Sequence, residues 1–167
     1  MFYLILILLI VQRLGELLLA RRNERLVRAE GAYEVGADHY KWIVLMHTGW
    51  FFSMIVEYQF SAPPAEPYML ILLGIFLLAQ VMRYYVIVTL GKHWNTRILI
   101  LPGSTRVRRG LYRFINHPNY WIVRVELLIV PLMFGLYITA VVFSILNYFM
   151  LRRRIRMEDE ALGALRG

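Results

Sequence analysis

The chain has 167 residues, of which 59% are hydrophobic and 18% are charged, and its formal net charge is +8. A soluble domain is about half apolar and about a quarter charged, so this composition excludes disorder and disfavours a soluble globule. The absence of cysteine excludes disulfides, thiolate metal sites and cysteine nucleophiles. In so apolar a chain, excess Lys and Arg fits the edges of membrane spans better than a nucleic-acid surface. We expect one integral membrane domain, 1–167, that binds no nucleic acid.

Four apolar regions follow one another along the chain, at residues 2–20, 42–60, 68–90 and 118–151. Each of the first three is close to the roughly 20 residues that a spanning helix needs. The first contains Arg13 and Glu16 where a cleavable signal would carry small residues, so we expect it to be a permanent helix. The fourth is too long for one span and is broken near Pro131 and Gly135.

The distribution of charge decides the predicted topology. Sixteen of the 19 Lys and Arg residues lie in the segments 21–41, 92–113 and 152–167, whereas 61–67 has none. The positive-inside rule places the three basic segments in the cytoplasm and 61–67 outside. The fourth region must then enter and leave on one side, as a hairpin of two short helices turning near 134–136. The prediction is an all-α membrane protein of about five transmembrane helices, with the N-terminus outside and the C-terminus cytoplasmic.

Charged side chains inside predicted spans usually face the interior of a bundle. Arg13 and Glu16 are three residues apart on one helical face, which predicts an internally satisfied pair that orients the first helix. Arg83, Arg124 and Glu126 are expected at one depth near the cytoplasmic side. There they would form a polar substrate pocket walled by apolar helices, suited to a polar cofactor and a lipophilic substrate.

The segment between the third and fourth apolar regions is too polar to span and contains the β-rich run 98–101. Pro118 suits the first position of a helix, and the preceding His117 suits a cap. Free backbone N–H groups at such a helix start favour an anionic ligand group. Taken alone, His117 is equally explained as a capping residue without chemistry. In the tail, Arg154 and Glu158 share one helical face and are equally explained as a surface pair.

Three motifs occur in order: Gly110-Leu111-Tyr112, His117-Pro118-Asn119-Tyr120 and Arg154-Ile155-x-x-Glu158-Asp159. The set resembles the isoprenylcysteine carboxyl methyltransferase family of integral-membrane enzymes, over roughly residues 80–162. Arg83 and the run Leu90-Gly91-Lys92-x-Trp94 are also similar to the family pattern. The stretches QRLGELLLARRNER and HYKWIVLMH resemble a bacterial subgroup associated with type III polyketide synthases, whose members methylate alkylpyrones. Residues 1–66 would then be N-terminal helices and 67–167 the family-like catalytic core.

The resemblance implies that S-adenosylmethionine (SAM) binds in a cytoplasm-facing pocket between the loop, the hairpin and the C-terminal helix. It implies cofactor contacts from Ser104, Thr105, Arg106, Val107, Tyr112, His117, Pro118, Asn119, Tyr120 and Glu158. It also implies that Arg154 positions the methyl acceptor and that His117 belongs to the catalytic set. Asn116 departs from the family pattern, in which an arginine commonly precedes His-Pro.

The predicted function is SAM-dependent O-methylation of an acidic oxygen, a carboxylate or an enol, on a lipophilic acceptor in the cell membrane. The resemblance favours an alkylpyrone-type polyketide lipid as acceptor and a type III polyketide synthase as partner. Methyl transfer needs mainly an in-line arrangement of the reacting atoms, and an anionic acceptor needs no strong base. A small transporter or channel subunit and a non-catalytic membrane scaffold stay open as alternatives. Only the methyltransferase requires SAM binding that depends on His117 and Glu158.

Overall fold

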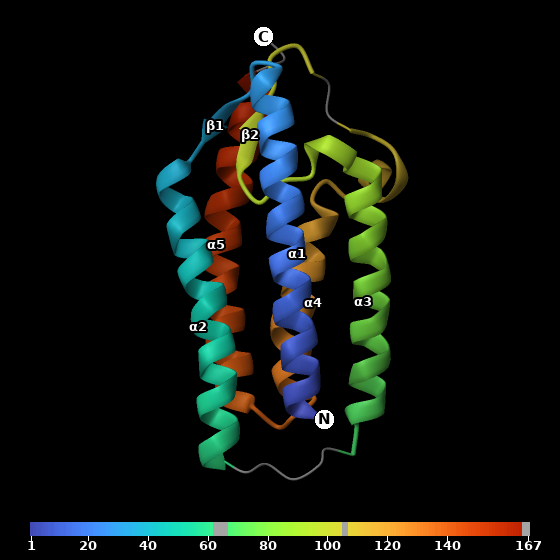
Figure 1. Ribbon diagram of the computed structural model, residues 1–167, viewed down its shortest axis with the longest axis vertical. Helices are drawn as coiled ribbons and strands as arrows, with labels where there is room; N and C mark the ends of the chain where they lie inside the picture. Colours follow the sequence, from blue (N-terminus) through green and yellow to red (C-terminus); the bar gives the residue numbers. More distant parts are fainter. Residues whose placement is uncertain (62–66, 105–106, 165–167) are drawn as a thin grey trace.

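The apolar regions of the sequence form long α-helices (Figure 1). The computed structural model describes residues 1–61, 67–104 and 107–164. Within these ranges the α-helices are α1 (Phe2–Ala29), α2 (Ala37–Ser61), α3 (Met69–Leu90), α4 (Pro118–Leu132) and α5 (Tyr137–Ala164). Two of these elements are long and apolar enough to cross a membrane, namely Phe2–Ala29 and the continuous stretch Met69–His93.

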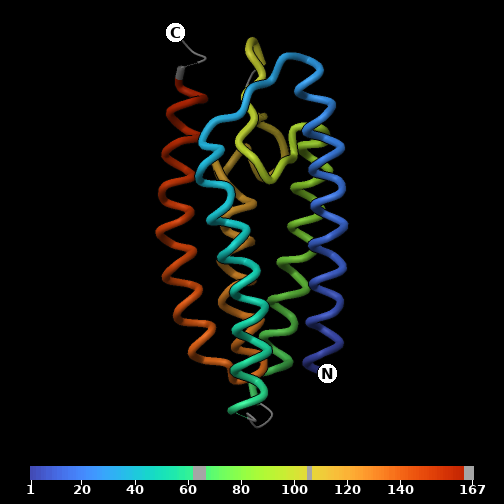
Figure 2. Tube along the Cα trace, turned by 60° about the vertical axis from the view of Figure 1, so that its left-hand side comes forward, coloured from blue at the N-terminus to red at the C-terminus, as the bar shows by residue number. Residues whose placement is uncertain are grey.

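A short two-stranded sheet lies at one end of the bundle, where α1 ends and the C-terminal part of α5 lies (Figures 1 and 2). Strand β1 (Tyr33–Val35) pairs with β2 (Ile98–Ile100) in antiparallel register, with Glu34 opposite Leu99. Two single-turn 3₁₀ helices, η1 (Gly91–His93) and η2 (Gly110–Arg113), lie between α3 and α4. We call this end of the bundle, which contains β1, β2, η1 and η2, the sheet end. The N-terminus lies at the opposite end, with the last turn of α2 and the first turn of α3.

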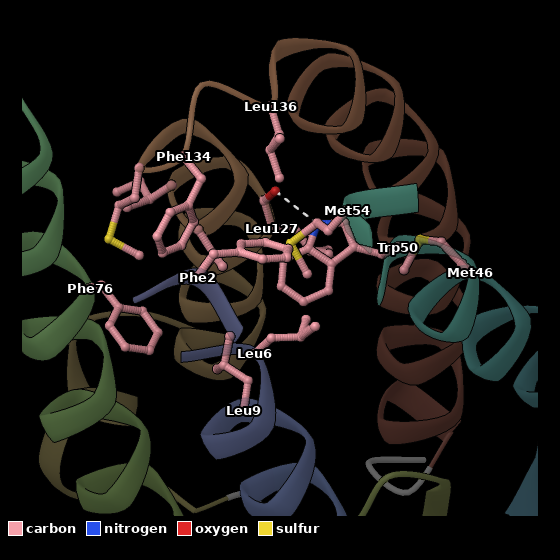
Figure 3. Close-up of a cluster of buried hydrophobic side chains, with 13 residues drawn as sticks. Phe2, Leu6, Leu9, Met46, Trp50, Met54, Phe76, Leu127, Phe134 and Leu136 are labelled. Atoms are coloured by element: carbon pink, nitrogen blue, oxygen red, sulfur yellow. Dashed lines mark hydrogen bonds between the residues drawn. The ribbon is translucent and has the colours of Figure 1, made fainter. Parts of the chain in front are cut away.

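Helix α4 lies between α3 and α5 and packs against both, while α2 packs against α5. Away from the sheet end, apolar side chains of α1, α2, α3 and α4 form a buried cluster (Figure 3). Phe2 and Leu6 of α1 point toward Trp50 and Met54 of α2 in this cluster. Trp50 Nε1 donates to the carbonyl of Leu127, 3.2 Å away, so the cluster also ties α2 to α4.

The chain turns back between α4 and α5 at the position where the sequence breaks its fourth apolar region. Pro131 lies inside the last turn of α4, and its carbonyl accepts the backbone N–H groups of Phe134 and Leu136, both at 3.0 Å. Gly135 has a φ of +67°, a conformation that a residue with a Cβ adopts only at a cost. The turn therefore satisfies the carbonyl that the end of α4 would otherwise leave unpaired.

Glu57 of α2 caps the start of α5. Its carboxylate accepts the backbone N–H groups of Ile138 and Thr139 at 2.9 and 2.7 Å, and the Thr139 hydroxyl at 2.6 Å. A carboxylate at a helix N-terminus satisfies unpaired N–H groups and complements the helix dipole. This contact fixes the end of α2 against the return of the chain.

Candidate functional site

A pocket opens at the sheet end between β2, the start of α4 and the C-terminal part of α5. Its cavity volume is about 110 Å³. The residues that line it are Leu90, His93, Trp94, Asn95, Arg97, Ile98, Leu99, Ile100, Tyr112, His117, Asn119, Tyr120, Arg154, Glu158 and Leu162. The pocket therefore brings together residues from all three sequence motifs.

Arg154 of α5 is buried in the wall of this pocket, with 7% of its surface exposed. Its Nε donates to the Tyr120 hydroxyl at 2.8 Å, and its Nη2 donates to the Thr96 carbonyl at 2.8 Å. The Tyr120 hydroxyl in turn donates to the Glu158 carboxylate. Burial on its own lowers the pKa of Arg154, but its interactions with Tyr120 and Glu158 outweigh burial and raise it, so the guanidinium stays charged.

Arg154 and Glu158 are therefore joined through Tyr120 of α4 in the wall of a pocket. Arg154 and Glu158 are therefore not an ordinary surface pair, because Arg154 is buried and Tyr120 lies between them. A guanidinium held from two directions keeps a fixed orientation, which a flexible surface arginine does not.

His117 lies at the N-cap position of α4, but its side chain makes no capping hydrogen bond. Its Nε2 lies 3.2 Å from Asp159 Oδ1, and its Nδ1 lies 3.7 Å from Glu158 Oε2. The imidazole also stacks on the Tyr120 ring, with the two centroids 5.2 Å apart. His117 thus occupies the predicted cap position, while its side chain is directed at α5.

Tyr112 lines the pocket, and η2, which carries it, packs closely against α3. Gly110, the first residue of η2, has a φ of +58°, and a Cβ placed on it would lie 2.8 Å from the Tyr85 hydroxyl. Arg109 fixes the same loop, because its guanidinium donates to the Thr89 carbonyl at 2.9 Å. Glycine in the Gly-x-Tyr motif is explained by this close packing and by the positive φ.

The other residues of the predicted cofactor strip are placed differently. Ser104 closes a turn, since its N–H and its hydroxyl bond to the Leu101 carbonyl at 3.1 and 2.7 Å. Neither Ser104 nor Val107 is among the described residues that line the pocket. Thr105 and Arg106 lie outside the described residues. Pro118 is buried in the first turn of α4, next to the pocket-lining residues His117 and Asn119.

Arg83 and Glu126 meet inside the bundle, below the pocket, rather than among its lining residues. Glu126 accepts Arg83 Nε at 2.9 Å, Gln80 Nε2 at 2.7 Å, and further bonds from Arg83 Nη2 and Arg13. Arg13 also pairs with Glu16 at 2.6 Å, as the sequence predicts. The two carboxylates and two guanidiniums balance in charge and tie α1, α3 and α4 together. We call these four residues, Arg13, Glu16, Arg83 and Glu126, the buried ion cluster.

Arg124, the third residue of the predicted substrate pocket, lies elsewhere. Its guanidinium carbon is 4.8 Å from the centroid of the Trp121 ring, and its Nε is buried with no hydrogen-bond partner in residues 1–61, 67–104 and 107–164. The three charges are thus not gathered in one polar pocket. Arg83 and Glu126 belong to the buried ion cluster, which links helices, while Arg124 packs on an aromatic ring.

One wall of the pocket consists of residues to which the sequence assigned no role. This wall runs from Leu90 to Ile100, and β1 supports it from outside. Arg97 pairs with Glu34 of β1 at 2.6 Å and stacks on the Tyr40 ring at 4.3 Å. The only sequence signals for this wall were the family-like run ending at Trp94 and the β-rich run that became β2.

The family and relatives of the chain agree with this site. Residues 70–164 match the isoprenylcysteine carboxyl methyltransferase (ICMT) family, and the match includes all three motifs. The chain is 41% identical to the uncharacterized protein YpbQ of Bacillus subtilis, over 97% of this chain and 96% of that protein. It is 29% identical to an uncharacterized protein of Haemophilus influenzae, over 92% of this chain and 90% of that protein. No solved structure matches the chain.

The family match covers more than half of the chain, and the Bacillus relative is similar over nearly its full length. The family fits the two helices that are apolar enough to cross a membrane and the pocket built from its motifs. The chain therefore belongs to the isoprenylcysteine carboxyl methyltransferase family of membrane methyltransferases.

Proposed function

We propose that this protein is a SAM-dependent O-methyltransferase that methylates an acidic oxygen of a lipophilic acceptor. The observation that carries the proposal is the pocket in which the Tyr120 hydroxyl is hydrogen-bonded to both Arg154 and Glu158. Tyr120 is more than 30 residues away in the sequence from Arg154 and Glu158. Together the three side chains combine a fixed cation with a carboxylate. The alternatives, a transporter subunit and a membrane scaffold, give no reason for this arrangement.

The residues of the pocket fit SAM, which carries an amino group, a carboxylate, ribose hydroxyls and an adenine. The Glu158 carboxylate suits the amino group or the hydroxyls. The Asn119 Oδ1 is buried without a hydrogen-bond partner within the described part of the chain, and it suits a donor of the cofactor. Tyr112 and the segment from His117 to Tyr120 would complete the cofactor site. When bound, SAM supplies an activated methyl group, and the protein supplies the geometry.

Arg154 is the group best placed to orient the acceptor. It is buried, its charge is retained, and its Nε and Nη2 bonds hold the guanidinium plane in one orientation. A carboxylate or an enolate is already anionic at neutral pH, so Arg154 has to position the oxygen and not remove its proton. Positioning of the reacting atoms is a major source of rate acceleration in such a reaction.

An alkylpyrone-type polyketide lipid is the acceptor that we favour. A 4-hydroxy-2-pyrone carries an acidic enol, which suits Arg154, and its alkyl chain suits an apolar bundle. The outer faces of the helices expose many large apolar side chains, among them Leu70, Val88, Ile138 and Phe149. Such a surface is suited to lipid contact, so an acceptor dissolved in the bilayer would reach the protein there.

We further propose five transmembrane helices with the pocket in the cytoplasm. The pocket lies at the sheet end, where the basic residues of α1 and of the C-terminal part of α5 also lie. The N-terminus and the last turn of α2 lie at the other end (Figure 2). Reporter fusions placed within residues 62–66 and after Leu162 should report opposite sides of the membrane. The same side for both fusions would contradict this topology.

The decisive experiment is a radiolabelled-methyl assay on membranes that contain the protein, with alkylpyrones and prenylcysteine analogues offered in parallel. Glu158→Gln should weaken SAM binding about ten- to a hundredfold, because a charged hydrogen bond contributes roughly 1.5–3 kcal/mol. Glu160→Gln, on an exposed residue of the same helix, is the matched control and should bind SAM as the wild type does. Absence of SAM binding by the folded wild-type protein would refute the enzyme and favour a scaffold.

A further inference from the structure

Trp94 is one of the residues in the Leu90–Ile100 wall of the pocket. It follows η1 directly and has only 3% of its surface exposed. Its carbonyl accepts Asn23 Nδ2 at 2.8 Å, and its N–H bonds to the Gly91 carbonyl at 3.1 Å, so the backbone position is fixed. The buried residues that cluster with it come from α1, α3 and α4: Ala20, Ala79, Val86 and Ile122. The indole is thus held rigidly at the boundary between the pocket and the apolar interior.

The indole N–H of Trp94 is buried and has no hydrogen-bond partner among the residues that the structure describes. An unsatisfied buried donor is unfavourable by about 1–3 kcal/mol, and most buried polar groups in proteins are paired. Trp50 shows the usual situation in this same chain, since it is equally buried at 3% exposure and donates to the Leu127 carbonyl. An unpaired donor on a residue that lines a pocket is explained when a ligand supplies the acceptor.

The surroundings of Trp94 select which ligand that is. The buried residues packed against Trp94 are apolar. The groups that suit a polar cofactor, such as Glu158 and Asn119, lie on α5 and α4. Arg154, which we assign to the acceptor, donates to the carbonyl of Thr96, two residues from Trp94. Arg154 is therefore bonded to the same short segment of the pocket wall that carries Trp94.

We infer that Trp94 Nε1 donates a hydrogen bond to the acidic group of the methyl acceptor, beside Arg154; this inference rests on the proposed function. A carboxylate or a hydroxypyrone enolate shares its charge between two oxygens. A donor that engages one of these oxygens leaves the other available for methylation and fixes its direction. Trp94 is in this way a substrate-binding residue that favours acceptors with two conjugated oxygens over simple alcohols.

The first test is Trp94→Phe, which keeps an aromatic ring at this position of the pocket wall and removes the indole N–H donor. The Michaelis constant for an alkyl-4-hydroxy-2-pyrone should rise about ten- to a hundredfold, the effect of one lost hydrogen bond to a charged group. SAM affinity, measured by calorimetry, should stay at the wild-type value. Trp121→Phe, at an exposed tryptophan of α4, is the control and should change neither quantity. An unchanged Michaelis constant, or a loss of SAM affinity in place of it, overturns the inference.

The second test needs no activity and uses the wild-type protein labelled with ¹⁵N at its tryptophan indoles. The Trp94 resonance is identified by its absence from Trp94→Phe, and it should shift when the hydroxypyrone is added and stay in place when SAM alone is added. A shift without any methyl transfer refutes the proposed function and leaves Trp94 Nε1 only as a donor to a bound hydroxypyrone. Methyl transfer without a shift refutes the inference and keeps the proposed function.

Discussion

The buried ion cluster allows a sharp test of what holds the bundle together. Glu126 has 2% of its surface exposed and accepts hydrogen bonds from Arg83, Arg13 and Gln80. Glu126→Gln keeps the size of the side chain and removes one negative charge. Two guanidiniums then face the single carboxylate of Glu16, whose contact with Arg83 is the longer one at 3.4 Å. The substitution leaves one buried positive charge without compensation.

Removing one partner of a buried ion pair destabilises a protein by about 3–5 kcal/mol. For a chain of this size, each kcal/mol corresponds to roughly 2–4 °C in the unfolding temperature, so we expect a decrease of about 6–20 °C. Thermal unfolding in detergent or nanodiscs, followed by circular dichroism, measures this decrease. Glu24→Gln is the matched control, because the pair of Glu24 with Arg28 is partly exposed and such pairs contribute about 0–1 kcal/mol.

The double variant Glu126→Gln with Arg83→Gln restores the balance of charge, since Arg13 and Glu16 are left as one pair. It should therefore be more stable than Glu126→Gln alone, although it has lost more hydrogen bonds. A Glu126→Gln protein as stable as Glu24→Gln would refute the reasoning. A double variant less stable than the single one would show that hydrogen bonds, and not charge balance, decide the stability of this region.

Two further predictions concern the loop and the sheet end. Gly110→Ala should lower stability and SAM affinity more than Gly103→Ala in thermal and calorimetric measurements: both glycines have positive φ, but only at Gly110 would a Cβ meet the Tyr85 side chain. His39, which precedes the predicted span 42–60, has a pKa lowered by burial and further by the charges of Arg153 and Arg154. The unfolded chain then binds more protons than the folded one below about pH 6.5, so stability should fall as the pH drops, and His39→Gln should remove this component of the pH dependence of the unfolding temperature.

The sequence was sufficient for the positions of most helices, and it contains the three motifs that the structure brings together at one pocket. Apolar runs fixed the positions of α1 to α3, and the break near Pro131 and Gly135 marks where the chain turns back. α1 nevertheless continues to Ala29, past the apolar stretch, because residues 21–29 are mostly good helix formers such as Arg, Glu and Leu. Composition alone separates apolar residues from polar ones. It therefore predicts where a membrane span ends, and it does not predict where the helix that contains this span ends.

Partners between helices were beyond the reach of the sequence. Helical spacing shows that Arg13 and Glu16 share a face, but it does not show that Arg83 and Glu126 complete the same cluster. That contact depends on how α1, α3 and α4 are rotated against one another, which side-chain packing determines. Strand β1 was missed for a similar reason, because three residues with no hairpin turn to their partner carry no local signal.

The role of Arg154 depends on geometry that lysine cannot reproduce. Its Nε bonds to Tyr120 and its Nη2 to the Thr96 carbonyl, so two bonds from one rigid plane fix its orientation. Arg154→Lys keeps the positive charge and loses this plane. SAM affinity should stay near that of the wild type while turnover falls on the order of a hundredfold, because a displacement of the acceptor by about 1 Å has an effect of that size.

Arg153, the preceding residue of the same helix, is exposed, and Arg153→Lys should leave methylation unchanged. Equal turnover of the two variants would reduce Arg154 to one member of a basic cluster at the membrane surface. Loss of SAM affinity in Arg154→Lys alone would instead assign the guanidinium to the cofactor, and the acceptor would then have to be oriented by other groups of the pocket.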